Sequence, residues 1–227
     1  MPLLPYSSII PLFPMKPQTF EGIITNIEKL AKNVVFFTVA IEGAGVEFEA
    51  GQYMTVKMPS PTPLWRSYSI FSEPTEKNEL KFLIEIVPGG RASAYLERFS
   101  IGEKLELRGP MGFFTLQDSP SGHVFVATGT GIAPLYSMMK NLLAKNADAS
   151  AEVFFGVRNE EDLYLKEDLE TLAQKHPNFQ CLTTLSQPSD AWTGGRGRVT
   201  EYLEKLPLDP QKKYYLCGST DMINDVA

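Results

Sequence analysis

The sequence predicts two domains, an antiparallel β-barrel followed by an α/β domain built on a parallel sheet. Before about residue 115, apolar and polar residues alternate in short segments separated by glycine and proline turns, which is typical of half-buried antiparallel strands. After residue 120 the apolar runs become continuous and alternate with helical patterns, which indicates parallel strands covered on both faces. The length of 227 residues suits one large domain or two ordinary ones.

The first half contains five or six strand-like segments between Phe20 and Leu107, enough for a small barrel. Segments 54–58 and 80–86 show the period-two alternation most clearly. We therefore expect one face of each segment to point into the barrel. The residues on these inner faces are Met54, Val56, Met58, Leu80, Phe82, Ile84 and Ile86.

The second half contains buried strand candidates at 124–127, 153–155 and 214–217, and a helical pattern that runs from Ile132 to Leu143. We expect the barrel to span residues 18–115 and the α/β domain residues 120–227, joined around Gly112 to Pro120. Residues 1–17 are predicted to be an irregular lead-in, because prolines at positions 2, 5, 11 and 14 break a helix. That segment lacks a basic start, so neither a signal peptide nor a membrane span fits, and Met15 is an alternative start.

Composition narrows the functional classes. The net charge of −6 argues against a general nucleic-acid binder, although it leaves room for a local basic patch that docks a protein partner. The two cysteines, Cys181 and Cys217, cannot supply the four thiolates of a plant-type iron–sulfur cluster. Nothing in the chain suggests secretion. We therefore expect a cytoplasmic protein with reduced thiols and no metal site.

The strongest motif is the octet at 127–134, Ala-Thr-Gly-Thr-Gly-Ile-Ala-Pro, which directly follows an apolar run. It predicts a strand, then a tight turn at Gly129 and Gly131, then a helix that begins at about Pro134. The start of such a helix presents unpaired N–H groups, which suit a dinucleotide pyrophosphate. The octet departs from the longer Gly-x-Gly-x-x-Gly fingerprint of dinucleotide-binding proteins, because Pro134 stands where its third glycine would fall. A strand–turn–helix without a ligand is therefore the alternative interpretation.

Two motifs in the barrel half also suit a phosphate ligand. Arg66 offers a fork of donors for a phosphate, and Tyr68 and Ser69 follow it on the same strand. The alternative is an ordinary half-buried strand with a surface arginine. Residues 89–96 combine two glycines, a small hydroxyl residue and a short amphipathic run, which predicts either a second anion-binding helix start or a capped helix across the barrel mouth.

Taken together, six motifs resemble the ferredoxin–NADP reductase superfamily of flavin and nicotinamide oxidoreductases. The resemblance extends from about Phe20 to the C-terminus, which is nearly the whole chain. One such motif is weak evidence, whereas six in this order and spacing are strong. The motifs are Ala50-Gly51-Gln52-Tyr53, Arg66-Ser67-Tyr68-Ser69, Gly90-Arg91-Ala92-Ser93, Gly109-Pro110-Met111-Gly112-Phe113, Gly129-Thr130-Gly131-Ile132-Ala133-Pro134 and Cys217-Gly218-Ser219-Thr220-Asp221-Met222.

The resemblance implies that the barrel binds FAD. Arg66 would contact the pyrophosphate, Tyr68 would pack against the flavin and ribityl chain, and Ser69 would place its hydroxyl near flavin N5, which accepts hydride. The strand beside the cofactor and the pyrophosphate-binding turn would add further contacts. These further FAD-binding candidates are Glu85, Ile86, Val87, Arg91, Ala92 and Ser93. Ser67, from the motif Arg66-Ser67-Tyr68-Ser69, is a candidate as well.

The resemblance also implies a nicotinamide dinucleotide across the carboxyl ends of the parallel strands. Ser69, Thr130 and Cys217 become the candidate catalytic residues, because they would align the two rings. Cys217 has a second interpretation as an inert core cysteine at a strand end, but its place in the Cys-Gly motif favours a positioning role over a nucleophilic one. The candidate nucleotide contacts are Gly129, Thr130, Gly131, Ile132, Cys217, Gly218 and Met222.

The choice of coenzyme depends on the segment after the second parallel strand. Arg158 could hold a 2′-phosphate there, but acidic residues at 160–162 oppose the extra charge. Arg196 and Arg198 could restore the balance, although a solvated loop is the simpler interpretation. We expect NADH, with NADPH as the alternative.

The resulting hypothesis is an FAD enzyme that takes hydride from NAD(P)H and passes single electrons to a separate ferredoxin, flavodoxin, cytochrome or oxygenase component. Family members usually continue past the Cys-Gly motif into a further strand and an aromatic lid, whereas this chain stops at Ala227, so we expect the C-terminal end of the domain to be incomplete. That departure motivates the alternative of a non-catalytic flavin-binding subunit of a larger redox complex. A structural protein with vestigial motifs is the third hypothesis.

Overall fold

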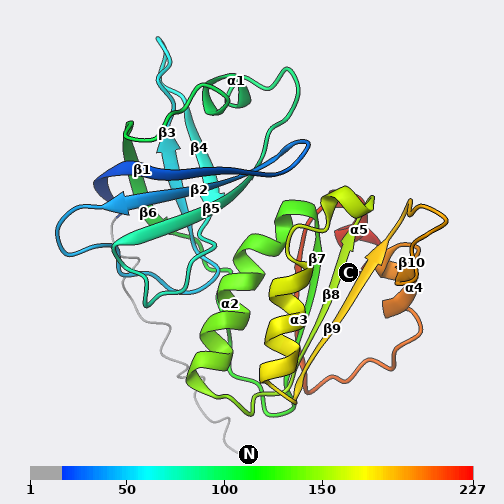
Figure 1. The fold of residues 1–227 in the computed structure, drawn as a ribbon. Helices are drawn as coiled ribbons and strands as arrows, with labels where there is room; N and C mark the ends of the chain where they lie inside the picture. Colours follow the sequence, from blue (N-terminus) through cyan, green and yellow to red (C-terminus); the bar gives the residue numbers. More distant parts are fainter. Residues whose placement is uncertain (1–16, 227) are drawn as a thin grey trace, which may run out of the picture.

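The structure is a computed structural model that describes residues 17–226, and it consists of two sheets with helices on both faces of the second (Figure 1). The predicted lead-in at 1–17 lies outside this range except for its last residue. The first sheet comprises β1 (Gln18–Ala31), β2 (Val34–Ile41), β3 (Tyr53–Lys57), β4 (Trp65–Ser69), β5 (Glu79–Glu85) and β6 (Lys104–Met111), with α1 (Ser93–Leu96) between the last two. The second comprises β7 (His123–Thr128), β8 (Ala151–Val157), β9 (Phe179–Leu185), β10 (Gly195–Arg196) and β11 (Lys213–Cys217).

The first sheet is antiparallel throughout, in the order β4-β3-β6-β1-β2-β5. An isolated bridge between Ile70 and Phe82 joins its two edges, so the sheet closes on itself as the sequence predicts. The predicted inner face is buried in full, from Met54 in β3 to Ile86 after β5. Leu83 breaks the alternation, because its side chain is also buried, on the outer face that meets the second sheet.

The second sheet is parallel, in the order β10-β9-β8-β7-β11. Its central strands are apolar on both faces, because Phe125 and Ala127 pack toward α2 and α3 while Val124 and Val126 pack toward α4 and α5. The chain leaves β7 in one direction and returns on its other side as β11, so the strand order reverses between these two strands. Bounds of the covering helices are α2 (Ile132–Lys145), α3 (Lys166–Lys175), α4 (Val199–Leu203) and α5 (Thr220–Val226).

Two features of the second sheet differ from the sequence-based expectation. β9 and β10 were not predicted, because β9 carries a half-buried stretch around Cys181 that shows neither a continuous apolar run nor clean alternation. The helix α2 begins at Ile132 instead of Pro134, after one 3₁₀ turn, η1 (Gly129–Gly131). Pro134 is tolerated inside the first turn because its missing N–H would have no helical partner there.

The two sheets share a hydrophobic cluster, so the barrel and the α/β half are packed against each other. Ala31, Val34 and Leu83 from the barrel belong to the same buried cluster as Ile132 and Leu135 of α2. β6 ends at Met111 and β7 begins at His123, and the segment between them crosses from one half to the other. Among residues 17–226, no helix is both long and apolar enough to cross a membrane.

Candidate active site

A cleft of about 1020 Å³ lies where the outer face of the barrel meets the carboxyl ends of the parallel strands. This volume is at the upper end of the range for ligand pockets, about 300–1,000 Å³. Ser69 and Tyr68 of β4 contribute to one wall, and Thr130 and Cys217 to the other. All three candidate catalytic residues, which are separated by up to 148 positions in the sequence (217 − 69), therefore line one cavity.

The floor of the cleft is held by hydrogen bonds between the ends of β7 and β11. Thr128 Oγ1 accepts a hydrogen bond from the Ser219 N–H at 2.9 Å, and Ser219 Oγ accepts one from the Met222 N–H at 3.2 Å. Ser219 thereby acts as the N-cap of α5 and fixes its first turn over the sheet. Thr128 and Ser219 were not among the predicted site residues, although each is adjacent in sequence to a predicted glycine.

The two predicted turn glycines have different structural reasons. Gly129 has a φ of +53°, and a Cβ placed on it would meet nothing within 4 Å, so its backbone faces open space in the cleft. Gly131 has an ordinary φ of −60°, but a Cβ there would lie 2.4 Å from the Cys217 carbonyl oxygen and 2.6 Å from Gly218 Cα. Gly129 therefore leaves room for a ligand, whereas Gly131 lets η1 approach the end of β11.

The strand β4 lies at one end of the sheet order and pairs along its length with β3. It contributes Ser67, Tyr68 and Ser69 to the barrel wall of the cleft. Tyr68 also packs on the barrel core, where its ring contributes to a small gap among core side chains. Burial raises the pKa of Tyr68 to about 12, and the nearby Arg66 guanidinium offsets part of this effect. The Tyr68 phenol is therefore neutral and able to donate a hydrogen bond at neutral pH.

The raised pKa of Tyr68 predicts a loss of stability in strong alkali. Its pKa is about 12 in the folded chain against 10.0 ordinarily, so the unfolded chain releases the proton first and stability falls between pH 10 and pH 12. We expect the Tyr68→Phe variant to lose less stability than the wild type across that window, as measured by urea unfolding at pH 9, 10 and 11. Equal slopes for the two proteins would contradict the assignment.

Seven predicted contact residues lie outside the cleft lining. Ile86 and Ile132 have buried side chains in the two cores, so only their backbone atoms are available to a ligand. Ser93 Oγ accepts a hydrogen bond from the Val87 N–H at 2.9 Å, so this hydroxyl closes its own loop. Arg66 is exposed and donates to the Trp65 carbonyl oxygen at 2.8 Å. The remaining members of this group are Val87, Arg91 and Ala92, which lie on the barrel beyond β5.

The structure shows which of the charged residues near the predicted coenzyme site line the far wall of the cleft, which the sequence alone could not show. Arg158 and Arg198 line the cleft, whereas Arg196 donates to carbonyl oxygens of its own loop, among them Trp192 at 2.7 Å. Glu160 accepts hydrogen bonds from the N–H and hydroxyl of Ser189, at 2.8 Å and 2.7 Å, and these bonds lower its pKa. Arg196 and Glu160, which the sequence offered as opposing influences on coenzyme choice, are therefore both held by hydrogen bonds outside the cleft lining.

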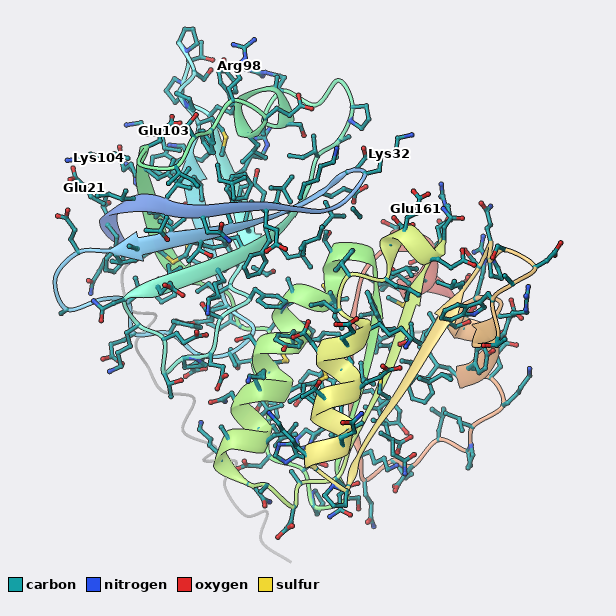
Figure 2. The ribbon with its side chains drawn as sticks, viewed as in Figure 1. Glu21, Lys32, Arg98, Glu103, Lys104 and Glu161 are labelled. Carbon is teal, nitrogen blue, oxygen red and sulfur yellow. The ribbon has the colours of Figure 1, made fainter. Side chains whose placement is uncertain are left out.

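Two further charged residues line the cleft. Lys32 lies at the turn between β1 and β2, and Glu161 lies below it on η2 (Glu160–Asp162) (Figure 2). Glu161 belongs to the acidic run that the sequence placed beside the coenzyme, whereas Lys32 was not predicted to be part of the site. The only sequence signal of Lys32 is a polar turn after an apolar strand, which most surface turns share.

The cysteines carry no sign of nucleophilic activation. Cys217 lines the cleft and Cys181 lies on β9, and both are free thiols. Burial raises the pKa of each thiol above its ordinary value, so both are protonated at neutral pH. The structure thus gives Cys217 a position in the wall without the thiolate that covalent chemistry would need.

A closed barrel packed on a parallel sheet, with a cleft that reaches the strand-order reversal between β7 and β11, defines a protein that binds nucleotide cofactors at the junction. Residues 21–116 match the oxidoreductase FAD-binding domain, and residues 125–227 match the oxidoreductase NAD-binding domain. Ferredoxin–NADP reductase B of Sorangium cellulosum is 35% identical over 192 residues, which cover 81% of this chain and 79% of that protein. The chain belongs to the ferredoxin–NADP reductase superfamily.

Other relatives extend this comparison. The anthranilate 1,2-dioxygenase electron transfer component of Acinetobacter baylyi is 36% identical over 183 residues, which cover 80% of this chain but only 53% of that protein. This chain therefore spans about half the length of that relative. The Amycolatopsis cytochrome P450 reductase GcoB has a TM-score of 0.84 at 25% identity, over 92% of this chain and 66% of that one. A ferredoxin NADP⁺ reductase from Neisseria gonorrhoeae with bound FAD and NADP has a TM-score of 0.80 at 21% identity, over 92% of this chain and 88% of that one, which supports the fold.

The residues of the cleft fit both cofactors. The cavity volume exceeds what one small ligand needs, and the open space beside Gly129 leaves a backbone turn accessible at the end of β7. Hydroxyls from Ser67 and Ser69 are available on the barrel wall, and the guanidinium of Arg158 is available on the other. The predicted pair of FAD and a nicotinamide nucleotide is confirmed at the level of the two matching domains.

Proposed function

We propose that this chain is an FAD-dependent NAD(P)H oxidoreductase that delivers electrons one at a time to a separate acceptor. The observation that carries the proposal is the single cleft whose two walls belong to the two matching domains, with Ser69 on one wall and Thr130 and Cys217 on the other. A cleft of this kind brings two ring systems into contact, which is what hydride transfer requires.

When bound, FAD would supply the acceptor at flavin N5 for the hydride of NAD(P)H, from which the two electrons pass singly to one-electron acceptors and the proton passes to solvent. The chain supplies binding and alignment. On the barrel wall, Tyr68 would support the flavin and Ser69 would donate a hydrogen bond near N5. On the opposite wall, Thr130 would contact both rings, and Cys217 would support the nicotinamide from below.

The acceptor and the compartment are part of the same proposal. By its name, the Acinetobacter relative transfers electrons for an anthranilate dioxygenase, and the Sorangium relative is a ferredoxin–NADP reductase, which supports a ferredoxin or an oxygenase component as acceptor. Flavodoxin and cytochrome acceptors stay within the same chemistry. Free thiols at Cys181 and Cys217 support a reducing, cytoplasmic setting.

For the coenzyme we propose NADH, as the sequence suggests, with NADPH as the competing substrate. Glu161 and Asp162 remain on the cleft wall to oppose a 2′-phosphate, but Arg158 and Arg198 lie there too. Since Glu160 is held by Ser189, the acidic opposition is weaker than the sequence alone implies. The margin between the two coenzymes should therefore be small.

Anaerobic mixing of the FAD-loaded chain with NADH should bleach the flavin absorbance within seconds, because the hydride needs only a bound and aligned nucleotide. The same experiment with NADPH should also reduce the flavin, with an affinity within about tenfold, which corresponds to about 1.4 kcal/mol. Dithionite, which needs no nucleotide site, serves as the control. A chain that dithionite bleaches but that stays yellow with both nucleotides is not an NAD(P)H oxidoreductase.

The second candidate function is a flavin-binding subunit that receives or relays electrons without oxidising a nucleotide itself. The observation that favours it is the name of the Acinetobacter relative, an electron transfer component, of which this chain covers 53%. Steady-state oxidation of NADH with ferricyanide separates the two candidates. Turnover at ordinary enzyme rates, above about 1 s⁻¹, excludes the non-catalytic subunit.

A further inference from the structure

One loop of the barrel is docked on one face of α2 through three consecutive residues. The Phe71 ring stacks on the Tyr136 ring, with centroids 4.4 Å apart and planes 9° from parallel. The backbone carbonyl oxygen of the next residue, Ser72, accepts a hydrogen bond at 2.7 Å from the Ser137 hydroxyl, and both of these serines are buried. The third pair is an ion pair between Glu73 and Lys140, with Oε1 and Nζ 2.9 Å apart.

The loop is fixed to the barrel on its other side. The Ile70 N–H donates to the Gln52 carbonyl oxygen at 2.9 Å, and the Phe71 N–H donates to the Lys81 carbonyl oxygen at 2.8 Å. The Ser72 hydroxyl accepts a further hydrogen bond from the Lys81 N–H at 3.2 Å. The loop therefore moves with β3 and β5 rather than independently of them.

The helix is equally fixed to the α/β half. Ile132, Leu135 and Met138 have no exposed side-chain surface, and they belong to the cluster that covers β7 and β8. Close-packed cores of this kind resist displacement because there is no free volume into which side chains can move. A contact between this helix and the barrel loop therefore joins two stiff bodies.

Each end of the contact lies close in sequence to a residue of the cleft. Ser69 on β4 is two residues before Phe71, which limits the chain between them to about 7 Å. Tyr136 lies four residues after the start of α2 at Ile132, or about 6 Å along the helix axis, and Thr130 is in the turn before that start. One physical connection between the two cleft walls therefore runs through this contact.

We propose that Tyr136, Ser137 and Lys140 of α2 are positioning residues, which set the separation of the flavin and nicotinamide rings through the loop at Phe71–Glu73 without touching either cofactor. This inference rests on the proposed hydride transfer between the two walls. Rates of such transfers depend steeply on the approach distance, and a misplacement of about 1 Å costs about 100-fold. Loss of the contact between the loop at Phe71–Glu73 and α2 should therefore slow flavin reduction more than it weakens the binding of FAD or the nucleotide.

The Ser137→Ala variant tests the hydrogen bond. We expect the limiting rate of anaerobic flavin reduction in stopped flow to fall about tenfold, because a shift of a few tenths of an ångström is enough. The FAD dissociation constant and the nucleotide concentration at half-maximal rate should stay within about twofold of the wild type, that is within about 0.4 kcal/mol. The long-wavelength charge-transfer absorbance of the mixed complex, which reports ring contact, should weaken in parallel.

Two further variants keep the result interpretable. Leu172→Ala on α3 removes a buried side chain of the same cluster, so it lowers the melting temperature, but it should leave the reduction rate of the folded enzyme unchanged. Lys140→Glu should slow reduction, because it places two carboxylates against each other, and the double swap Lys140→Glu/Glu73→Lys should restore the rate.

The outcomes separate this inference from the proposed function. A wild-type enzyme that neither nucleotide reduces defeats the proposed function. A wild-type enzyme that is reduced while Ser137→Ala matches its limiting rate overturns the positioning inference alone. Equal slowing by Ser137→Ala and Leu172→Ala, or failure of the double swap to restore the rate, would also overturn it, since the contact would then act only through stability.

Discussion

Gly131→Ala should reduce the rate of flavin reduction by NAD(P)H at least about 100-fold, although the change adds a single methyl group. The backbone of Gly131 has φ −60° and ψ −15°, which any residue adopts, so the substitution causes no conformational strain of its own. The new Cβ would instead lie 2.4 Å from the Cys217 carbonyl oxygen and 2.5 Å from its carbonyl carbon. Both neighbours are backbone atoms, so η1 or the end of β11 has to move.

Such a displacement changes the two elements that form the α/β wall of the cleft. We expect the turn at Thr130 and the strand end at Cys217 to separate, and the nucleotide to lose its alignment. Overpacking of this kind costs about 1–3 kcal/mol of stability, which a domain of this size tolerates. Stopped-flow reduction of the flavin, together with urea unfolding, measures the two effects separately.

The control for this prediction is Gly102→Ala on the barrel. Gly102 has a φ of +90°, and a Cβ there would meet nothing within 4 Å. The control therefore adds conformational strain without a collision and far from the cleft, and it should lower stability by about 1–2 kcal/mol with no change in reduction rate. A Gly131→Ala enzyme that reduces its flavin as fast as Gly102→Ala would show that η1 and β11 need not approach this closely.

Arg66→Ala should weaken FAD binding about 10- to 100-fold and leave the fold intact. A charge-assisted hydrogen bond from a guanidinium to a phosphate contributes about 1.5–3 kcal/mol, and each 1.4 kcal/mol is a factor of ten. The Arg66 side chain is exposed, and its bond to the Trp65 carbonyl oxygen is local, so the barrel does not depend on it. Alternation along β4 places Arg66 on the same side as Tyr68, whose ring also packs on the barrel core, and Arg66 itself lies outside the cleft lining.

FAD titration of the apoprotein by fluorescence quenching measures this effect directly. Arg98→Ala is the matched control, because Arg98 is an exposed arginine on the same half of the molecule, beside α1 (Figure 2). We expect the control to bind FAD as tightly as the wild type, and the unfolding free energies of both variants to stay within about 0.5 kcal/mol of it. If Arg66→Ala retained FAD normally, the pyrophosphate contact would have to come from elsewhere.

The kind of each sheet and the order of the motifs were determined by the sequence alone. Period-two alternation around Met54 and Phe82 is a local property, as is a continuous apolar run such as 124–127. Both can be recognised without knowing which strands pair with each other. The same locality explains the errors. Pro134 marked the helix region but not its first residue, and β9 was missed because its pairing with β8, more than its own pattern, makes it a strand.

Only the tertiary structure decided which residues meet. Ser69, Thr130 and Cys217 lie on three different elements, and their meeting depends on how a barrel and a sheet pack, which no local pattern encodes. The structure also separated Arg198, on the cleft wall, from Arg196, which is bound to its own loop. Short-range forces act between neighbours in space, so the roles of side chains that are distant in sequence become visible only once the chain is folded.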